Sequence, residues 1–282
     1  MHKTYKQLDY FKFNKMDKVN IIIPMAGKGE RFLDAGYKIP KPLLKIGEKP
    51  IIEHIINTMR MPNAQFIFIV RQDHCDEVQL DKKLLEIEPT AKIIKINQIT
   101  EGAICTVLLA KEYFNDDNPV IIKDCDQIIN WDPEHLIDFT ERNNADGAIV
   151  NIHTDRPNYS FSRVDSKGRI IETAEKTVIS NNGSVGIYHF RKGSDLVKYA
   201  QKMIDKNLRV NNEFYTAPVY NQFIQDFKLI LHYPIAEMFQ LGTPEEFYEN
   251  KDKTLNFLEK KKFIKPTEKE ITLPEKEYKP FY

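Results

Sequence analysis

The chain has 282 residues, and its 41 basic and 41 acidic residues leave no formal net charge. A balanced charge provides no overall field toward nucleic acid or anionic lipid, so neither is expected as a partner. No apolar run approaches the ~20 residues of a membrane-spanning helix. The first 18 residues lack the apolar stretch of a secretory signal. The three cysteines (Cys75, Cys105 and Cys125) lack metal-type spacing, which fits a reducing cytoplasm better than a disulfide framework. We therefore expect a cytoplasmic protein.

Residues 19–127 alternate between short apolar runs and segments whose apolar residues have helical spacing. Buried strands are predicted at 19–23, 66–70, 92–96 and 119–127, and helices at 50–59, 74–87 and 102–114. Continuous apolar runs such as VNIII are typical of strands covered on both faces. The alternation of strand and helix predicts an α/β fold with a mostly parallel sheet flanked by helices.

The rhythm changes after Pro133. Helices are predicted at 133–142, 194–206 and 213–225, and shorter strands at 146–153, 160–165, 169–176, 183–190 and 228–233. A last helix is expected to begin at Thr243 and Pro244, with threonine as N-cap and proline in the first turn. Residues 1–18 are read as an N-terminal arm. Residues 251–282 are rich in lysine and glutamate, which indicates a solvated tail or an arm for a homo-oligomer.

A glycine-containing loop, AGKGER at 26–31, follows the first strand directly. It has neither the G-K-[ST] of a Walker A loop nor the third glycine of the dinucleotide fingerprint. Backbone N–H groups in such a turn can face a phosphate at the carboxyl end of a strand, where open parallel sheets bind ligands. A plain surface turn explains the glycines equally well. Arg31, as a bidentate fork, and Lys41, as a point charge, suit triphosphate oxygens and favour the phosphate site. Lys28 and Lys38 are read as solvated surface.

Two carboxylates, Asp124 and Asp126, end the fourth predicted strand and so lie at the same edge of the sheet. Mg²⁺ takes one or two carboxylates together with phosphate oxygens. The alternative is an N-cap or Asx-turn opening the next loop. Asp126 is the stronger metal candidate, and Asp124 is either a second ligand or a neighbour of the first.

Two further segments contain candidate binding groups. Gly102, after the segment INQITE, could let a nucleobase lie against the backbone, with Gln98 reading its edge; a helix N-terminus explains the glycine as well. Glu175 and Lys176 end a strand of the second half and could hold hydroxyls and the phosphate of an acceptor. Exposed salt-bridge partners are the ordinary explanation for such a pair.

The motifs AGKGERF, KPLL, QITEGA, KDCDQ, AEK, SVGIYHF, NNEFYTAPVYN and LGTPEEF occur in this order along about residues 19 to 250. In this order they resemble the sugar-phosphate nucleotidylyltransferase superfamily. The resemblance implies a Rossmann-like, GT-A-like domain at 19–250, with a nucleotide-binding half at 19–132 and an inserted acceptor-binding half at 133–250. It also implies roles for individual residues: Met25, Ala26, Gly27 and Gly29 for the triphosphate with Arg31 and Lys41 as catalytic groups, Gln98 and Gly102 for the base, Asp126 and Asp124 for Mg²⁺, and Glu175, Lys176 and Glu213 for the acceptor.

Three positions depart from the family pattern. Cys125 replaces a glycine that many members have before the metal aspartate. Gln240 stands where many have a second metal carboxylate, shortly before the glycine–threonine of the late motif. Asn211 stands where an arginine is often found, with Arg209 nearby as a substitute. These departures put the second metal ligand and the acceptor recognition in question.

The resemblance implies transfer of a nucleoside monophosphate from a nucleoside triphosphate to a small phosphorylated acceptor, with release of pyrophosphate. The order and the residues of the motifs are most similar to those of members that serve capsule and surface-polysaccharide synthesis. This resemblance favours CTP as the nucleotide. Two other functions stay open: a glycosyltransferase that uses a nucleotide-sugar, and a catalytically silent nucleotide-binding subunit.

Overall fold

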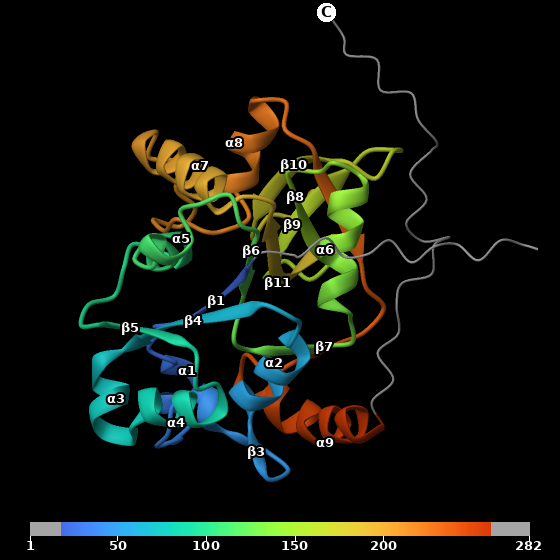
Figure 1. The fold of residues 1–282 in the computed structure, drawn as a ribbon. Coiled ribbons are helices and arrows are strands. Elements are labelled where there is room, and N and C mark those ends of the chain that lie inside the picture. The colour runs from blue at the N-terminus through green and yellow to red at the C-terminus, as the bar shows by residue number, and fades with distance from the viewer. Residues whose placement is uncertain (1–17, 261–282) are drawn as a thin grey trace, which may run out of the picture.

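The strand β1 (Val19–Met25) is an inner strand of the main sheet in the computed structural model, which describes residues 18–260 (Figure 1). It pairs in parallel with β4 (Ala64–Arg71) on one side and β6 (Val120–Lys123) on the other. The edge strand β5 (Lys92–Ile96) continues the parallel part beyond β4. The predicted α/β fold with a mostly parallel, helix-flanked sheet is therefore confirmed.

The second half of the chain extends this sheet with antiparallel pairs. The strands of this half are β8 (Gly147–His153), β9 (Ser160–Val164), β10 (Ile170–Glu175), β11 (Asn182–Phe190) and β12 (Ile230–Pro234). β11 pairs with β6, β8 and β9 in antiparallel fashion, β10 lies at the far edge beside β9, and β12 runs parallel to β8. Two small ribbons, β7 (Gln127–Ile129) with β13 (Met238–Gln240) and β2 (Lys45–Ile46) with β3 (Lys49–Pro50), lie outside the sheet.

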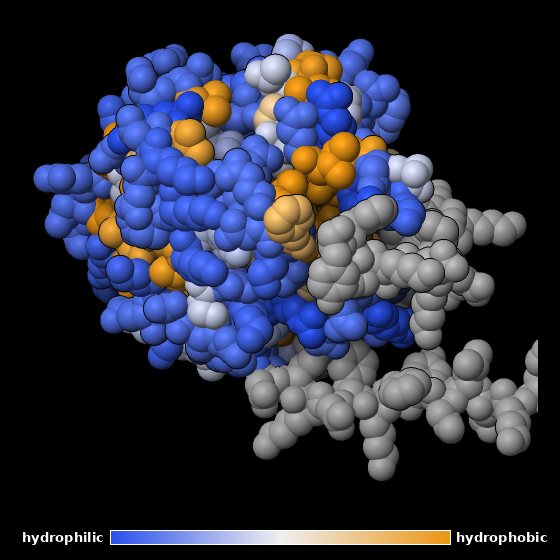
Figure 2. All heavy atoms as spheres, turned by 90° about the horizontal axis from the view of Figure 1, so that it is seen from above, coloured by the Kyte–Doolittle hydropathy of each residue, from blue (hydrophilic) through white to orange (hydrophobic). Residues whose placement is uncertain are grey.

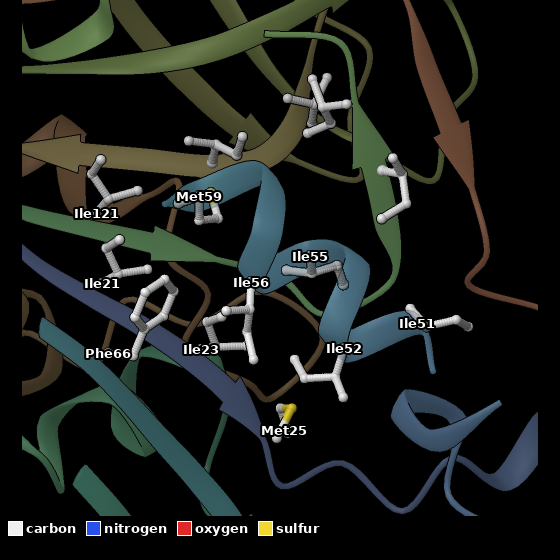
Figure 3. Packing of buried hydrophobic residues seen from close by; sticks show 14 of the residues in the cluster. Ile21, Ile23, Met25, Ile51, Ile52, Ile55, Ile56, Met59, Phe66 and Ile121 are labelled. Carbon is white, nitrogen blue, oxygen red and sulfur yellow. The ribbon is translucent and has the colours of Figure 1, made fainter. Parts of the chain in front are cut away.

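Helices cover both faces of the sheet, so β1 is apolar on both of its sides. On one face Ile21 and Ile23 of β1 pack beneath α2 (Ile51–Met59), whose Ile52 and Ile56 point at the sheet (Figure 3). On the other face Ile22 belongs to a second core cluster. That cluster includes residues of α5 (Ala103–Leu108), α7 (Gly193–Asp205) and α8 (Val219–Gln225). Burial of this kind contributes about 25 cal/mol per Å² of apolar surface. Seen from above, the outer surface is mostly hydrophilic and is interrupted by a few apolar groups (Figure 2).

Several predicted helices are shorter in the structure. The helix predicted at 74–87 is broken into α3 (Gln72–Val78) and α4 (Leu80–Ile87), because Gln79 adopts a left-handed conformation with φ 54°. The helix predicted at 102–114 ends at Leu108 and is followed by a 3₁₀ turn at Lys111–Tyr113. The helix predicted from 213 begins only at Val219. The reason is that the backbone of Phe214 is hydrogen-bonded to Glu101 and Ile104.

The final helix α9 runs from Pro244 to Lys260, so the tail predicted from residue 251 begins as part of a packed helix. Leu255 of α9 lies 3.0 Å from the position that a Cβ on Gly47 would occupy, which ties the helix to the β2–β3 ribbon. The rest of the predicted tail and residues 1–17 of the predicted arm lie outside the described residues. Two helices complete the described chain: α1 (Glu30–Asp34) and α6 (Pro133–Arg142). None of the helices within residues 18–260 is both long and apolar enough to cross a membrane.

Candidate active site

The carboxyl ends of β1 and β6 lie side by side in the sheet, and the loops that follow them border two cavities. The first cavity, of about 230 Å³, is lined by the glycine loop and the segment around Lys41. The second, of about 300 Å³, is lined mostly by residues of the second half of the chain. Asp124 and Asp126 line both cavities. These two residues, which we call the acidic motif, therefore lie between the two cavities. They are at the sheet edge where open α/β sheets bind ligands.

The glycine loop leaves open space at the first cavity. Met25, Gly27 and Gly29 line this cavity, and a Cβ built on either glycine meets no atom within 4 Å. Gly29 has φ 67°, a left-handed conformation that glycine adopts without strain, and α1 begins at the next residue. Ala26 does not line either cavity of the described chain, because its side chain is buried in the core cluster on the other face of the sheet.

Lys41 reaches the acidic motif directly. It begins a 3₁₀ turn between Pro40 and Pro42, and its Nζ donates to Asp126 Oδ2 over 2.9 Å. Burial, the largest single effect, lowers the pKa of Lys41, but the neighbouring Asp126, Cys125 and Asp124 together raise it by more, so the net shift is upward. Burial likewise raises the pKa of Asp126, but the charges of Lys41 and Lys123 and the hydrogen bonds that the carboxylate accepts together lower it by more. Both groups are therefore charged at neutral pH.

Arg31, the other predicted catalytic cation, lines the second cavity rather than the first. It is exposed on α1. The two predicted catalytic cations therefore line different cavities, Lys41 the first and Arg31 the second. Their joint action on one triphosphate remains a prediction.

The acidic motif is held by close backbone contacts. The Asp124 N–H donates to the Gly186 carbonyl over 2.9 Å, and a Cβ on Gly186 would lie 2.4 Å from Asp124 Oδ2. Burial, followed by the charge of Asp126, raises the pKa of Asp124 to about 7. The buried Oδ1 of Asp126 has no hydrogen-bond partner among the described residues. An orphaned carboxylate oxygen is a position that a bound cation satisfies, so the donor set fits the predicted Mg²⁺.

Lys123 is a functional candidate that the sequence analysis missed. Its side chain is buried at the end of β6, and its Nζ donates to the Asp124 carbonyl over 2.5 Å and to Gln127 Oε1 over 2.8 Å. The ammonium thus links the residues on either side of Cys125 and Asp126. Burial lowers the pKa of Lys123 to about 8, although Asp124 and Asp126 oppose this shift. A lysine at the end of an otherwise apolar strand, VIIK, was the signal available in the sequence.

The second cavity is lined by hydroxyl groups and by four carboxylates, of which that of Glu175 is buried. Glu175 accepts a hydrogen bond from Ser160. Burial raises the pKa of Glu175, although that hydrogen bond lowers it. The neighbouring Lys176 has φ 52° and lies over the ring of Tyr215, with its Nζ 4.5 Å from the ring centroid. Tyr159 also lines the cavity. Such a surface suits an acceptor with several hydroxyl groups.

Besides Ala26, four predicted binding residues are not among those that line the two cavities within residues 18–260: Gln98, Gly102, Lys176 and Glu213. Gln98 is exposed. Gly102 has φ 134°, and a Cβ there would lie 2.4 Å from the Phe214 carbonyl oxygen, so the close approach of two backbone segments already requires glycine. The backbone of Glu213 forms a bridge with Val210. The roles of these residues in base and acceptor recognition remain predictions.

The chain is similar in sequence to known proteins. The family described as Nucleotidyl transferase matches residues 20–256. The chain is 31% identical to the Bifunctional protein GlmU of Methanococcus aeolicus over 180 residues, which are 61% of this chain and 40% of that protein. It is 27% identical to a mannose-1-phosphate guanyltransferase of Yarrowia lipolytica over 59% of this chain and 48% of that protein. The chain thus spans less than half the length of these two relatives.

Solved structures show the same fold. A nucleoside-diphosphate-sugar pyrophosphorylase from Vibrio cholerae RC9 has a TM-score of 0.72 and 27% identity, covering 83% of this chain and 99% of that one. The inositol-1-phosphate CTP transferase from T. maritima has a TM-score of 0.68 over 85% of this chain and 96% of that one, and at 11% identity it shows the fold alone. With the family match over nearly the whole described chain, these findings identify the chain as a member of the sugar-phosphate nucleotidyltransferase superfamily.

Proposed function

We propose that this protein transfers a nucleoside monophosphate from a nucleoside triphosphate to a small phosphorylated acceptor and releases pyrophosphate. One observation supports this most directly: Asp124 and Asp126 line both cavities, between the glycine loop with Lys41 and the hydroxyl-rich surface with Glu175. The first cavity suits a triphosphate, and the second suits the acceptor. The α-phosphate would then lie beside the acidic motif, where the two substrates meet.

The chemistry in this proposal is a direct displacement. An oxygen of the acceptor phosphate forms a bond to the α-phosphorus, and the bond from that phosphorus to the bridging oxygen of the β-phosphate breaks. Because a phosphate monoester is already ionised at neutral pH, the step requires no protein base. The protein therefore contributes positioning and charge stabilisation. Lys41 neutralises phosphate oxygens in the first cavity, and Arg31 does so from the second.

We propose Mg²⁺ as the cofactor, held by Asp126 with help from Asp124 or another nearby oxygen. When bound, this ion supplies positive charge to the phosphate oxygens. Removal of divalent cations with EDTA is expected to abolish turnover, and added Mg²⁺ is expected to restore it. Full turnover in the presence of excess EDTA would contradict this part of the proposal.

For the nucleotide we propose CTP, and for the product an activated precursor of a capsule or surface polysaccharide made in the cytoplasm. The support is the resemblance of the motif series to capsule and surface-polysaccharide members. The test is a pyrophosphate-release assay in which CTP, UTP, GTP, dTTP and ATP are each paired with a panel of phosphorylated sugars and phosphorylated small alcohols. We expect the highest kcat/KM with CTP.

The same assay separates the other functions. Release with a nucleotide other than CTP would overturn the cytidylyl assignment and leave the nucleotidyltransferase in place. Nucleotide binding without release from any pair would overturn the transferase and favour a silent subunit. Hydrolysis or transfer from a nucleotide-sugar, with no reaction of the triphosphates, would favour a glycosyltransferase.

A further inference from the structure

Gln240 leaves the acidic motif without the second carboxylate that the family resemblance implies at its position. β13 pairs with β7 so that Gln240 lies opposite Gln127, and Gln240 lines the second cavity with Asp126. Its Nε2 donates to the Tyr159 hydroxyl over 2.8 Å. The Gln240 amide thus donates a hydrogen bond and adds no negative charge to the site. Another group must supply the charge if the cation site is to keep two carboxylates.

Glu246, in the first turn of α9, faces the same cavity. The Thr243 N–H donates to Glu246 Oε2 over 3.1 Å, and the Glu246 N–H donates to Thr243 Oγ1 over 3.2 Å. This pair of bonds is a capping box, which turns the Glu246 carboxylate back over the start of the helix. A carboxylate has about four acceptor positions, so the capping bond leaves most of them available.

Gly242 shows how close Glu246 and Asp126 lie. A Cβ on Gly242 would be 3.2 Å from Glu246 Oε2 and 3.3 Å from Asp126 Oδ2. The two carboxylate oxygens therefore border one small space, which is open because residue 242 has no side chain. The neighbouring Leu241 N–H donates to the Asp126 carbonyl over 2.8 Å and fixes the two segments against each other.

We propose that Glu246, together with Asp126, holds the divalent cation, and that Glu246 replaces the carboxylate missing at position 240. A further observation points to a cation here: the buried Oδ1 of Asp126 has no partner among the described residues, whereas Oδ2 already accepts a hydrogen bond from Lys41. Asp124 is the less suitable second ligand, because its Oδ2 lies against the backbone of Gly186. The inference rests on the proposed function only for what the cation does in catalysis.

The test measures direct binding of Mn²⁺ to the full chain without nucleotide. The electron paramagnetic resonance signal of free Mn²⁺ reports how much of the ion remains unbound. Glu246→Gln removes the charge and keeps the capping box, because glutamine serves at that position as glutamate does. Glu245→Gln, at an exposed residue on the same turn, is the matched control. We expect Glu246→Gln and Asp126→Asn to weaken Mn²⁺ binding by about tenfold or more, and Glu245→Gln to leave it unchanged. A thermal melt checks that the variants are folded.

A double variant, Glu246→Gln with Gln240→Glu, returns a carboxylate to the position that many family members use. It is expected to recover Mn²⁺ affinity, and failure to recover would overturn the replacement of position 240 by Glu246. Wild-type affinity in Glu246→Gln, equal losses in Glu246→Gln and Glu245→Gln, or no Mn²⁺ binding by the unaltered protein would each overturn the proposal. Pyrophosphate release is measured separately with Mg²⁺ and triphosphate, so a transferase that fails these binding tests still stands as a transferase.

Discussion

The ammonium of Lys41 donates a hydrogen bond of 2.9 Å to the Oδ2 of Asp126, a residue 85 positions further along the chain. Lys41 follows β1 by way of the glycine loop, and Asp126 follows β6, so the contact exists because these two strands are neighbours in the sheet. The contact joins the cationic wall of the first cavity to the acidic motif that lies between the two cavities. This ion pair is the structural centre of the proposed site.

Replacement of either partner of this pair is expected to reduce turnover strongly. Lys41→Ala and Asp126→Ala should each lower kcat by about 10²-fold or more, the scale of losing one key electrostatic group. Lys45→Ala is the control, because Lys45 is exposed in the β2–β3 ribbon. Pyrophosphate release is the measurement, and circular dichroism confirms folding. Near wild-type rates in both folded variants would refute the assignment.

Two glycines are expected to separate binding from stability. Gly27→Ala should leave the free energy of unfolding within about 0.5 kcal/mol of wild type, because nothing lies within 4 Å of the added Cβ. The same methyl group projects into space where we place the triphosphate, so nucleotide affinity should fall about tenfold. Gly102→Ala should lower the free energy of unfolding by about 2 kcal/mol or more, because its Cβ would collide with the backbone of Phe214. Urea unfolding and nucleotide titration check both. The reverse order of stabilities would contradict the geometry.

Lys123→Met is expected to reduce activity without a matching loss of stability. The buried ammonium links Asp124 to Gln127, so its removal should loosen the acidic motif and lower kcat about tenfold or more. Removal of the ammonium also removes the free-energy cost of burying a charge, and this gain offsets the lost hydrogen bonds. The free energy of unfolding at neutral pH should therefore change by no more than about 1 kcal/mol. Lys45→Met is the exposed control.

The pH dependence of unfolding gives a second readout for Lys123. Its pKa is about 8 in the folded protein and 10.5 in the reference state, so the unfolded chain binds the proton more tightly between these values. Stability from this residue should therefore rise as the pH increases from 8 toward 10.5. Urea unfolding across this range should show the rise in the wild type and its absence in Lys123→Met. An identical slope in both proteins would show that Lys123 does not titrate in this way.

His189 predicts a loss of stability in acid. It is buried, both ring nitrogens lack partners among the described residues, and burial lowers its pKa from 6.5 to about 3. The unfolded chain therefore binds a proton that the folded one does not, and the stability present above pH 6.5 falls as the pH drops toward 3. The full effect is about 5 kcal/mol. His189→Leu should flatten this part of the acid limb, whereas the exposed control His153→Leu should not. His232, with a pKa lowered to about 4 by burial, keeps some acid sensitivity in every variant.

The sequence by itself determined most of the order of the elements and the doubly covered inner strand of the sheet. The continuous apolar run at 19–23 predicted a strand buried on both faces, and the helical spacing at 50–59 predicted the helix that packs on it. Lys41 and Asp126 could also be predicted, because Asp126 closely follows the carboxyl end of β6 and Lys41 lies in the cationic segment that follows β1, beyond α1. These features depend on local periodicity and strand ends, which are properties of short segments.

Only the tertiary structure decided the contacts between distant segments. The left-handed turn at Gln79 divides a pattern that reads as one helix, and the backbone of Phe214 explains why residue 102 is glycine. Glu246 approaches Asp126 only because α9 begins beside the acidic loop. Periodicity reports which face of an element is buried. It does not report which residue of another element lies opposite, because that depends on how the strands and helices are arranged in the folded chain.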